Sequence, residues 1–177
     1  MIALDLDGTL LDYSPEGERP AVNWWALNEL QRRGVRRAAF LTNQGGICFG
    51  VMGSLRKNGL PYPTPKQFYV RLGVAISALA QRRINVDAVR VSCWHPAAQT
   101  QPEVAAAVQK AAQEVRGLLA PLHWVEWCVY TTARARKPEP LMLRSVGATE
   151  YWGDSPEDGG AARAAGVPFV KVDRFFG

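Results

Sequence analysis

Short apolar runs alternate with helix-forming segments along almost the whole chain, and this alternation limits the folds that it can adopt. Strand-like runs are predicted at residues 1–7, 38–41, 87–93, 124–130, 150–152 and 169–172. Helices are predicted at residues 22–34, 64–83, 102–119, 141–146 and 156–165. Such alternation favours a parallel sheet with right-handed crossovers and helices on both faces. We therefore predict an α/β fold, a three-layer, Rossmann-like arrangement around a central, mostly parallel sheet.

Three segments fit this alternation less well. Residues 13–20 read as a polar connection, and residues 48–65 are rich in glycine and proline without periodicity, which predicts an extended surface loop. Residues 97–133 are the least regular part and are predicted to be a small helix-strand insertion. The chain has 177 residues, 47% of them hydrophobic, which is enough for one substantial core. We predict a single domain over residues 1–177.

Composition narrows the class of protein. The apolar stretches are far shorter than the roughly 18 residues of a membrane span, and the N-terminus lacks the layout of a signal peptide. We expect a cytoplasmic monomer with no membrane partner. Three scattered cysteines do not form a disulfide framework. The net charge of +5 comes from dispersed arginines, which is weak evidence for a nucleic-acid partner.

Two acids stand at the end of the first strand-like run. Asp5 and Asp7 are two residues apart, so both carboxylates can project to one side while Leu6 points into the core. One acid can then attack while the other moves a proton. Gly8 allows a sharp turn beside them, and we expect the Thr9 hydroxyl to hold that turn through a local hydrogen bond. Alone, the pair is better explained as an ordinary strand end followed by a solvated turn.

The surrounding residues add a resemblance. Residues 2–12, Ile-Ala-Leu-Asp-Leu-Asp-Gly-Thr-Leu-Leu-Asp, resemble the first motif of the haloacid dehalogenase superfamily. That resemblance implies a hydroxyl residue at the end of the next strand, then a basic residue, then acids after a late strand. Thr42, Lys137 and the pair Asp154 and Asp158 stand in that order. Each also has an ordinary structural interpretation as a strand end, an exposed lysine or a helix cap.

The resemblance implies a phosphatase, a phosphoric monoester hydrolase that works through an aspartyl-phosphate. Asp5 would be the nucleophile, and Asp7 would first protonate the leaving alcohol and then activate water. Thr42, the Asn43 N–H and Lys137 would bind the phosphate oxygens.

The resemblance also implies a Mg²⁺ ion, because a carboxylate nucleophile and a phosphate dianion repel each other. The Asp5 side chain, the Asp7 backbone carbonyl and Asp154 would hold the ion. Asp158 would either ligate the ion or orient Lys137, and both roles stay open.

Motif spacing points to a branch of the superfamily. About thirty residues separate Asp7 from Thr42, which leaves no room for a large cap domain. Residues 42–47, 93–96 and 136–140 are similar to the cap-poor branch that contains histidinol-phosphatase, heptose bisphosphate phosphatase and the phosphatase domain of polynucleotide kinase-phosphatases. The basic residue that this branch usually has after the second motif is replaced by Cys48-Phe-Gly.

Zinc is a separate question in that branch. Its metal-binding members carry a Cys-x-His pair after the third strand and a Cys-x-Cys pair before the Arg-Lys-Pro segment. This chain has Cys93 and His95 but only Cys128 on the other side, with His123 as a further candidate. A tetrahedral structural site needs four ligands, so we do not expect zinc here.

The substrate and two rival functions stay open at this stage. A small phosphorylated metabolite is the expected substrate, and a nucleic-acid end carrying a 3′-phosphate is the alternative, with Phe49 and Tyr62 as candidate stacking residues. A catalytically silent binding module is one rival, which the intact acids and Lys137 disfavour. A phosphotransferase is the other, which the lack of a water-excluding cap disfavours.

Overall fold

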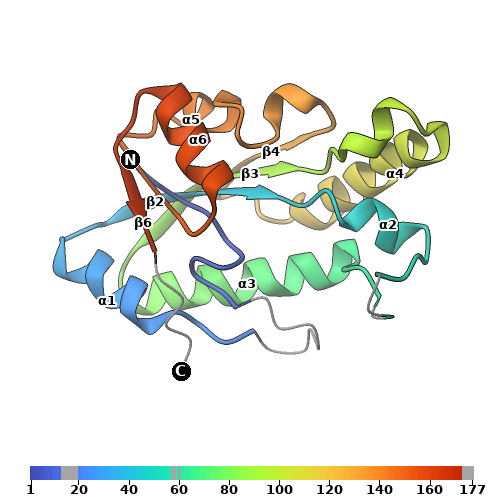
Figure 1. Ribbon diagram of the computed structural model, residues 1–177. Coiled ribbons are helices and arrows are strands. Elements are labelled where there is room, and N and C mark those ends of the chain that lie inside the picture. The colour runs from blue at the N-terminus through green and yellow to red at the C-terminus, as the bar shows by residue number, and fades with distance from the viewer. Residues whose placement is uncertain (13–19, 57–58, 60, 173–177) are drawn as a thin grey trace.

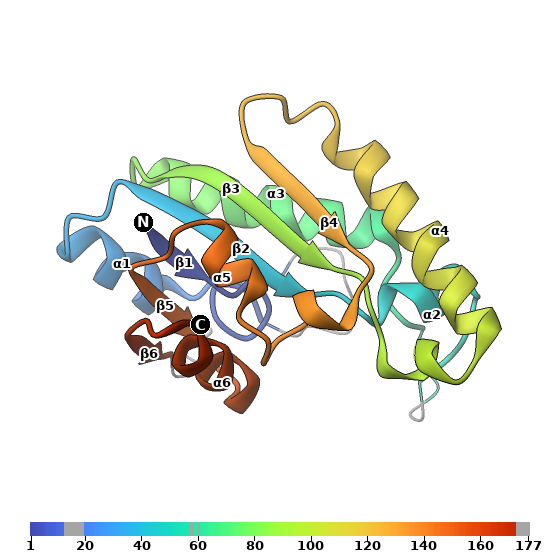
Figure 2. The same cartoon turned by 90° about the horizontal axis from the view of Figure 1, so that it is seen from above.

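Six parallel strands form one sheet (Figure 1), and Figure 2 shows their order, β4-β3-β2-β1-β5-β6, from above. The computed structural model describes residues 1–12, 20–56, 59 and 61–172. Within these residues every pairing between named strands is parallel. The strands are β1 (Ile2–Leu4), β2 (Arg37–Asn43), β3 (Asn85–Ser92), β4 (Glu126–Tyr130), β5 (Glu150–Gly153) and β6 (Phe169–Lys171).

Helices cover both faces of the sheet. In Figure 1, α1 and α3 lie below the strands, whereas α5 and α6 lie above them. The helices are α1 (Trp24–Arg32), α2 (Ile47–Val51), α3 (Pro65–Gln81), α4 (Pro102–Leu119), α5 (Leu141–Ser145) and α6 (Pro156–Ala165). Two 3₁₀ helices, η1 (Pro96–Gln99) and η2 (Ala133–Ala135), complete the connections. The predicted α/β fold with three layers is confirmed.

Each face of the sheet has its own core. The larger core joins the apolar stripes of α1, α3 and α4 to one face, with Leu30, Leu72 and Val115 among its buried members. The smaller core joins α5 and α6 to the other face around Met142 and Tyr151. Burial on both faces is what a parallel sheet requires, and it explains why the strands read as near-continuous apolar runs.

Capping residues set several helix ends where the sequence predicts them. The Thr64 side chain accepts a hydrogen bond from the Gln67 N–H and begins α3 with a capping box. Gly166 ends α6 in the left-handed conformation. The predicted helix at 102–119 has the bounds observed for α4. We also find that β4 pairs with β3 along the edge of the sheet, so residues 126–130 belong to the same sheet as β1.

The prediction for residues 48–65 is wrong at its start. Instead of an extended loop, α2 begins at Ile47 and runs to Val51. Ile47 and Cys48 are fully buried, so their side chains hold this short helix against the core. Most of the predicted connection over 13–20 lies outside the described residues. In the described part of the chain, no helix combines the length and apolarity needed to cross a bilayer.

Candidate functional site

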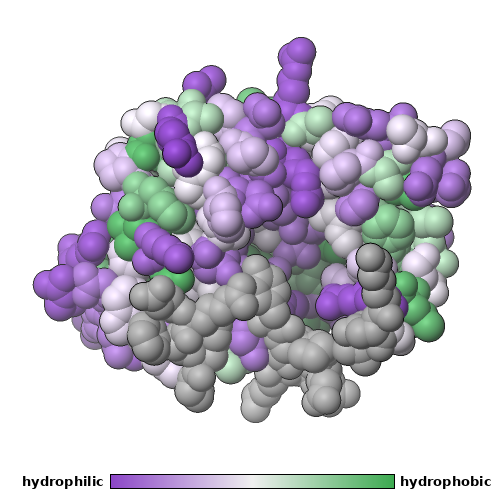
Figure 3. Space-filling view, viewed as in Figure 1, coloured by the Kyte–Doolittle hydropathy of each residue, from purple (hydrophilic) through white to green (hydrophobic). Residues whose placement is uncertain are grey.

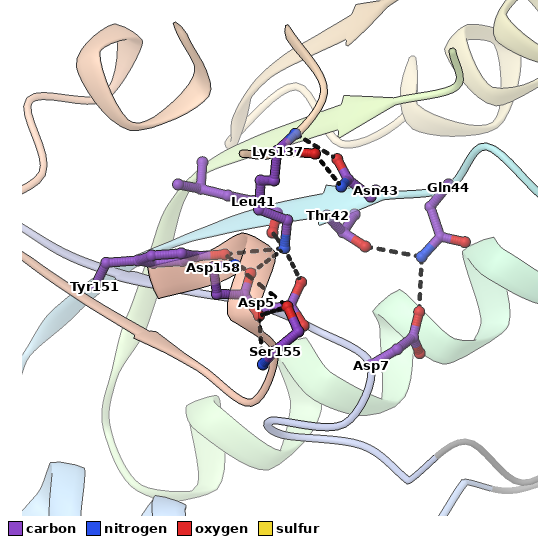
Figure 4. A network of polar contacts seen from close by, with 10 residues as sticks. All are labelled: Asp5, Asp7, Leu41, Thr42, Asn43, Gln44, Lys137, Tyr151, Ser155 and Asp158. Atoms are coloured by element: carbon purple, nitrogen blue, oxygen red, sulfur yellow. Dashed lines mark hydrogen bonds and ion pairs between the residues drawn. The ribbon is translucent and has the colours of Figure 1, made fainter. Parts of the chain in front are cut away.

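Three neighbouring strands bring the predicted site residues to one edge of the sheet. β2, β1 and β5 are adjacent and parallel, so their carboxyl ends lie side by side. Asp5 follows β1, Thr42 lies at the end of β2, and Asp154 follows β5. Figure 4 shows Asp5, Lys137 and Asp158 converging at this edge, with Asp7 to one side. This placement agrees with the prediction that the candidate site residues lie at the carboxyl ends of the strands.

A tight turn holds the first motif. The Asp5 N–H donates to the Trp152 carbonyl at 2.9 Å, which fixes the nucleophile candidate against β5. Gly8 adopts φ +85°, a conformation that favours glycine, and its N–H donates to the Leu11 carbonyl. The prediction that the Thr9 hydroxyl forms a local hydrogen bond is wrong, because this buried hydroxyl has no hydrogen-bond partner among the described residues. The backbone carbonyl of Thr9 instead accepts from Asn23 Nδ2 at 3.0 Å.

Lys137 lies at the centre of the site. Its side chain is 6% exposed, and its Nζ donates to Asp5 Oδ1 at 2.5 Å and to Asp158 Oδ1 at 2.6 Å. The same ammonium contacts the Tyr151 hydroxyl at 2.9 Å and the Leu41 carbonyl at 3.3 Å. One buried cation therefore joins two buried carboxylates, and the three groups depend on each other for charge compensation.

Asn43 fixes the backbone of that lysine. Its Nδ2 donates to the Lys137 carbonyl at 3.3 Å, and its Oδ1 accepts the Lys137 N–H at 3.1 Å. The amide side chain thereby pairs the end of β2 with the segment before α5. The sequence predicts a role for the Asn43 backbone N–H, and this side-chain role is a finding of the structure.

Asp158 is occupied by protein donors on both oxygens. Its Oδ1 accepts from Lys137 and from the Tyr151 hydroxyl at 2.6 Å. Its Oδ2 accepts from the Ser155 N–H at 3.0 Å and the Ser155 hydroxyl at 2.6 Å, which forms the capping box of α6. These contacts favour orientation of Lys137 over metal ligation. A Cβ at Gly153 would lie 2.4 Å from the Asp158 Cβ, so glycine allows this close approach.

The carboxylates also form a candidate metal site. One oxygen from each of Asp5, Asp154 and Asp158 lies within 4.8 Å of the others, and no other described cluster meets this criterion. Oxygen ligands of this kind suit a hard divalent cation such as Mg²⁺. Because the hydrogen bonds above occupy Asp158, Asp5 and Asp154 are the side chains best placed to hold an ion.

Burial and charge set the protonation of the cluster. Burial raises the pKa of Asp5 to about 8, and Lys137 only partly opposes this effect. Burial also disfavours the ammonium of Lys137, but the two carboxylates outweigh it and raise the pKa of the lysine. Burial would raise the pKa of Asp158, but the charge of Lys137 and the hydrogen bonds from Lys137, Ser155 and Tyr151 together outweigh it and lower that pKa. Lys137 is therefore charged, whereas Asp5 needs a further cation to ionise fully near neutral pH.

Asp7 points toward a different partner. Arg71, in α3, donates from Nε and Nη2 to Asp7 Oδ1 at 2.9 and 2.5 Å. Gln44 Nε2 donates to Asp7 Oδ2 at 2.7 Å and to the Thr42 hydroxyl at 2.8 Å. The sequence gives no signal for Arg71, since a single arginine within an amphipathic helix has nothing to distinguish it.

Five of the predicted residues line a small polar cavity, whereas Asp154 and Asp158 are not part of its lining. It measures about 200 Å³ and its lining includes Asp5, Asp7, Thr42, Asn43 and Lys137. In Figure 3 hydrophilic residues gather around a hollow near the middle of the face seen in Figure 1.

A second groove adjoins this cavity. It measures about 540 Å³ and shares Arg136 and Lys137 with the cavity, while Trp94, Pro96 and Arg134 line it further out. No pattern in the sequence predicts this groove.

Among the described residues, the cysteines and histidines weighed as zinc ligands form no cluster of three or more. Cys93 is fully buried in the larger core, and burial raises the pKa of its thiol to about 12. The His95 and Phe49 rings meet edge to face, with their centroids 4.7 Å apart. The Nδ1 atom of His95 accepts a hydrogen bond from the Ala97 N–H at 3.2 Å. The ring centroids of Phe49 and Tyr62 lie 5.0 Å apart, so Phe49, in α2, packs against both His95 and Tyr62.

Comparison with known proteins finds no matching family model, no matching curated protein and no matching solved structure.

Proposed function

We propose that this chain is a Mg²⁺-dependent phosphatase of the haloacid dehalogenase type that hydrolyses a phosphate monoester through an aspartyl-phosphate on Asp5. One observation carries the proposal. The Lys137 ammonium lies 2.5 Å from the Asp5 carboxylate, and both groups line one small cavity with the Thr42 hydroxyl. A nucleophile, a cation and a hydroxyl donor around a small polar space are the groups that phosphoryl transfer needs.

Phosphate binding comes first. The Lys137 ammonium and the Thr42 hydroxyl would donate to the non-bridging oxygens of the phosphoryl group. The structure supports this role for Lys137, because Asn43 and Asp158 hold its backbone and its ammonium in place. A fixed cation stabilises charge in the transition state without reorganising during the reaction.

Phosphoryl transfer to Asp5 would follow. A carboxylate oxygen of Asp5 forms a bond to phosphorus as the bond to the leaving oxygen breaks. The carboxyl of Asp7 gives its proton to the leaving oxygen, so an alcohol departs. Asp5 then carries the phosphoryl group and Asp7 is ionised.

Hydrolysis would complete the cycle. Ionised Asp7 takes a proton from a water molecule as the water oxygen attacks phosphorus. The acyl-phosphate bond breaks, inorganic phosphate is released, and the Asp5 carboxylate is restored. The recovered proton leaves Asp7 ready for another turnover.

The donor set fits a Mg²⁺ ion. The carboxylates of Asp5 and Asp154 and the backbone carbonyl of Asp7 would hold it, and the oxygen donors agree with the preference of this ion. When bound, the ion supplies positive charge that reduces repulsion between the phosphate and the carboxylates. Asp158 would act on Lys137 in this arrangement, in keeping with its four protein hydrogen bonds.

The adjoining groove bears on the substrate. It opens from the cavity at Arg136 and Lys137 and has room for a leaving group larger than methanol. A small phosphorylated metabolite remains the proposed substrate, and a nucleic-acid 3′-phosphate remains the alternative. The groove is open to water, which disfavours transfer to an acceptor other than water.

A panel of phosphate esters with and without Mg²⁺ tests the proposal. It includes sugar phosphates, para-nitrophenyl phosphate and 3′-phosphorylated oligonucleotides. We expect Mg²⁺-dependent release of phosphate that Asp5→Asn abolishes. Asp87→Asn is the matched control, because it removes a carboxylate that pairs with Arg37 near the start of β3. No release from any ester by the natural chain, or full release by Asp5→Asn, would overturn the proposal.

A further inference from the structure

Arg71 is a buried charge on the core face of a helix. The buried residues of α3 are otherwise apolar and include Phe68, Leu72 and Ala75. The Arg71 side chain is only 10% exposed. Burying a guanidinium is costly unless its hydrogen bonds are satisfied, so its partners indicate what it does there.

Those partners belong to the first motif. Nε and Nη2 of Arg71 donate to Asp7 Oδ1 at 2.9 and 2.5 Å. Nη2 also donates to the backbone carbonyl of Asp12. One side chain therefore attaches both the carboxylate and the far end of the turn to α3.

Gln44 holds the other oxygen of the same carboxylate. Its amide donates at 2.7 Å to Asp7 Oδ2 and at 2.8 Å to the Thr42 hydroxyl, as Figure 4 shows. Donors on both oxygens fix the rotation of the Asp7 carboxylate. The amide also joins the proposed acid to the proposed phosphate-binding hydroxyl.

The distribution of these bonds leaves one oxygen able to exchange a proton. Both guanidinium bonds go to Oδ1 of Asp7, so Oδ2 can gain or lose a proton without breaking either. Gln44 donates to the ionised Oδ2 through a neutral amide, and turning that amide over would let its oxygen accept a hydrogen bond from a proton carried by Oδ2. If Arg71 served only to stabilise the fold, its partner would not need to be Asp7, a carboxylate that lines the cavity.

We propose that Arg71 is a positioning residue that, with Gln44, aims the Asp7 carboxylate at the leaving-group oxygen. This inference rests on the proposed phosphatase function. Its consequence is a dependence on the leaving group. An alkoxide needs a proton as it departs, whereas para-nitrophenolate departs without one. Loss of Arg71 therefore acts mainly on alkyl phosphates.

The test measures kcat/KM of each variant and of the natural chain at saturating Mg²⁺, on an alkyl phosphate and on para-nitrophenyl phosphate. The value of kcat/KM depends only on the steps up to departure of the leaving group, so a slower hydrolysis of the acyl-phosphate does not affect it. For Arg71→Met we expect kcat/KM to fall about a hundredfold on the alkyl phosphate and by less than about threefold on para-nitrophenyl phosphate.

Two variants complete the test. Lys66→Met, in the exposed first turn of the same helix, is the matched control and should leave both values unchanged. Arg71→Lys keeps the charge but not the two-nitrogen contact, and we expect about a tenfold loss on the alkyl phosphate alone. It also replaces Arg71→Met if the latter does not fold.

The outcomes separate the two proposals. Equal losses on both substrates, or no loss on either, overturn the role of Arg71 while leaving the phosphatase intact. Turnover of aryl phosphates alone by the natural chain also overturns it, because no leaving group is then protonated. No turnover of either substrate by the natural chain overturns the phosphatase itself.

Discussion

Two groups of strand ends on the same edge of the sheet differ in what their side chains do. After β1 and β5, polar side chains turn toward one another, and Lys137 joins the buried carboxylates of Asp5 and Asp158. After β3, Cys93 enters the apolar core and His95 packs on Phe49. Both groups contain residue types that bind metals or substrates. Only the first shows mutual charge compensation in a buried space, which is the stronger mark of a functional site.

Lys137→Met breaks the first group most severely. The change removes the shared cation and leaves Asp5 and Asp158 buried without it, so the free energy of unfolding should fall by about 3 kcal/mol near pH 8. The loss should be smaller near pH 5, where Asp5, with a pKa of about 8, carries a proton in the folded state. Urea titrations at both pH values measure it. Lys110→Met, at an exposed position of α4, is the control. Equal losses for the two variants would contradict the account.

Asp5→Asn tests the first group through the pH dependence of its stability. The pKa of Asp5 is about 8 in the folded state and near 3.8 without these contacts. Between these values the folded chain binds the proton more tightly than the unfolded chain, so the contribution of Asp5 to stability falls as pH rises. Without Mg²⁺, the variant should therefore gain stability relative to the natural chain as the pH rises from about 4 to about 8, by up to about 1.4 kcal/mol per pH unit. A difference that does not change with pH would count against a buried carboxyl here.

Tyr151→Phe tests the periphery of the same group. The variant loses a hydroxyl that contacts Lys137 Nζ at 2.9 Å and Asp158 Oδ1 at 2.6 Å. We expect the free energy of unfolding to fall by about 1.5 kcal/mol. Tyr130→Phe is the matched control, because its hydroxyl contacts Ser145 at 3.4 Å in an exposed position and lies outside the network around Lys137. If thermal melting shows no difference between the two variants, the network does not depend on Tyr151.

His95→Asn probes the second group and has the smallest expected effect. Asparagine keeps an acceptor for the Ala97 N–H, and loss of the ring contact with Phe49 should lower the free energy of unfolding by about 0.5 kcal/mol. Added Zn²⁺ should change neither melting temperature. A rise in melting temperature with Zn²⁺ that the variant loses would show that this group binds metal after all.

The sequence predicts much of this arrangement, and what it misses has a physical cause. Strand ends and helix caps leave local signals, so the α/β fold and the bounds of α4 follow from patterns of neighbouring residues. Asp5 and Asp7 are recognisable as candidate site residues for the same reason, because the motif that contains them is local. The partners of these acids are set by packing between distant segments: Arg71 reaches Asp7 from 64 residues away. No local pattern encodes that contact.

The short helix α2 and the role of Asn43 show the same limit. Glycines near residue 48 suggest a loop, yet burial of Ile47 and Cys48 outweighs that local preference. The Asn43 side chain pairs with the backbone of Lys137, 94 residues away. Ser155 and Asp158 form a capping box that the sequence does signal, but their link to Lys137 needs the fold.

Acid quenching during turnover tests the central claim most directly. The natural chain, mixed with Mg²⁺ and its best substrate from the panel, is stopped in acid, digested and analysed by mass spectrometry. We predict one phosphoryl group on the peptide that contains Asp5, lost on treatment with hydroxylamine and absent from Asp5→Asn. Turnover with no phosphoryl group on that peptide, or with one on another residue, would contradict the claim.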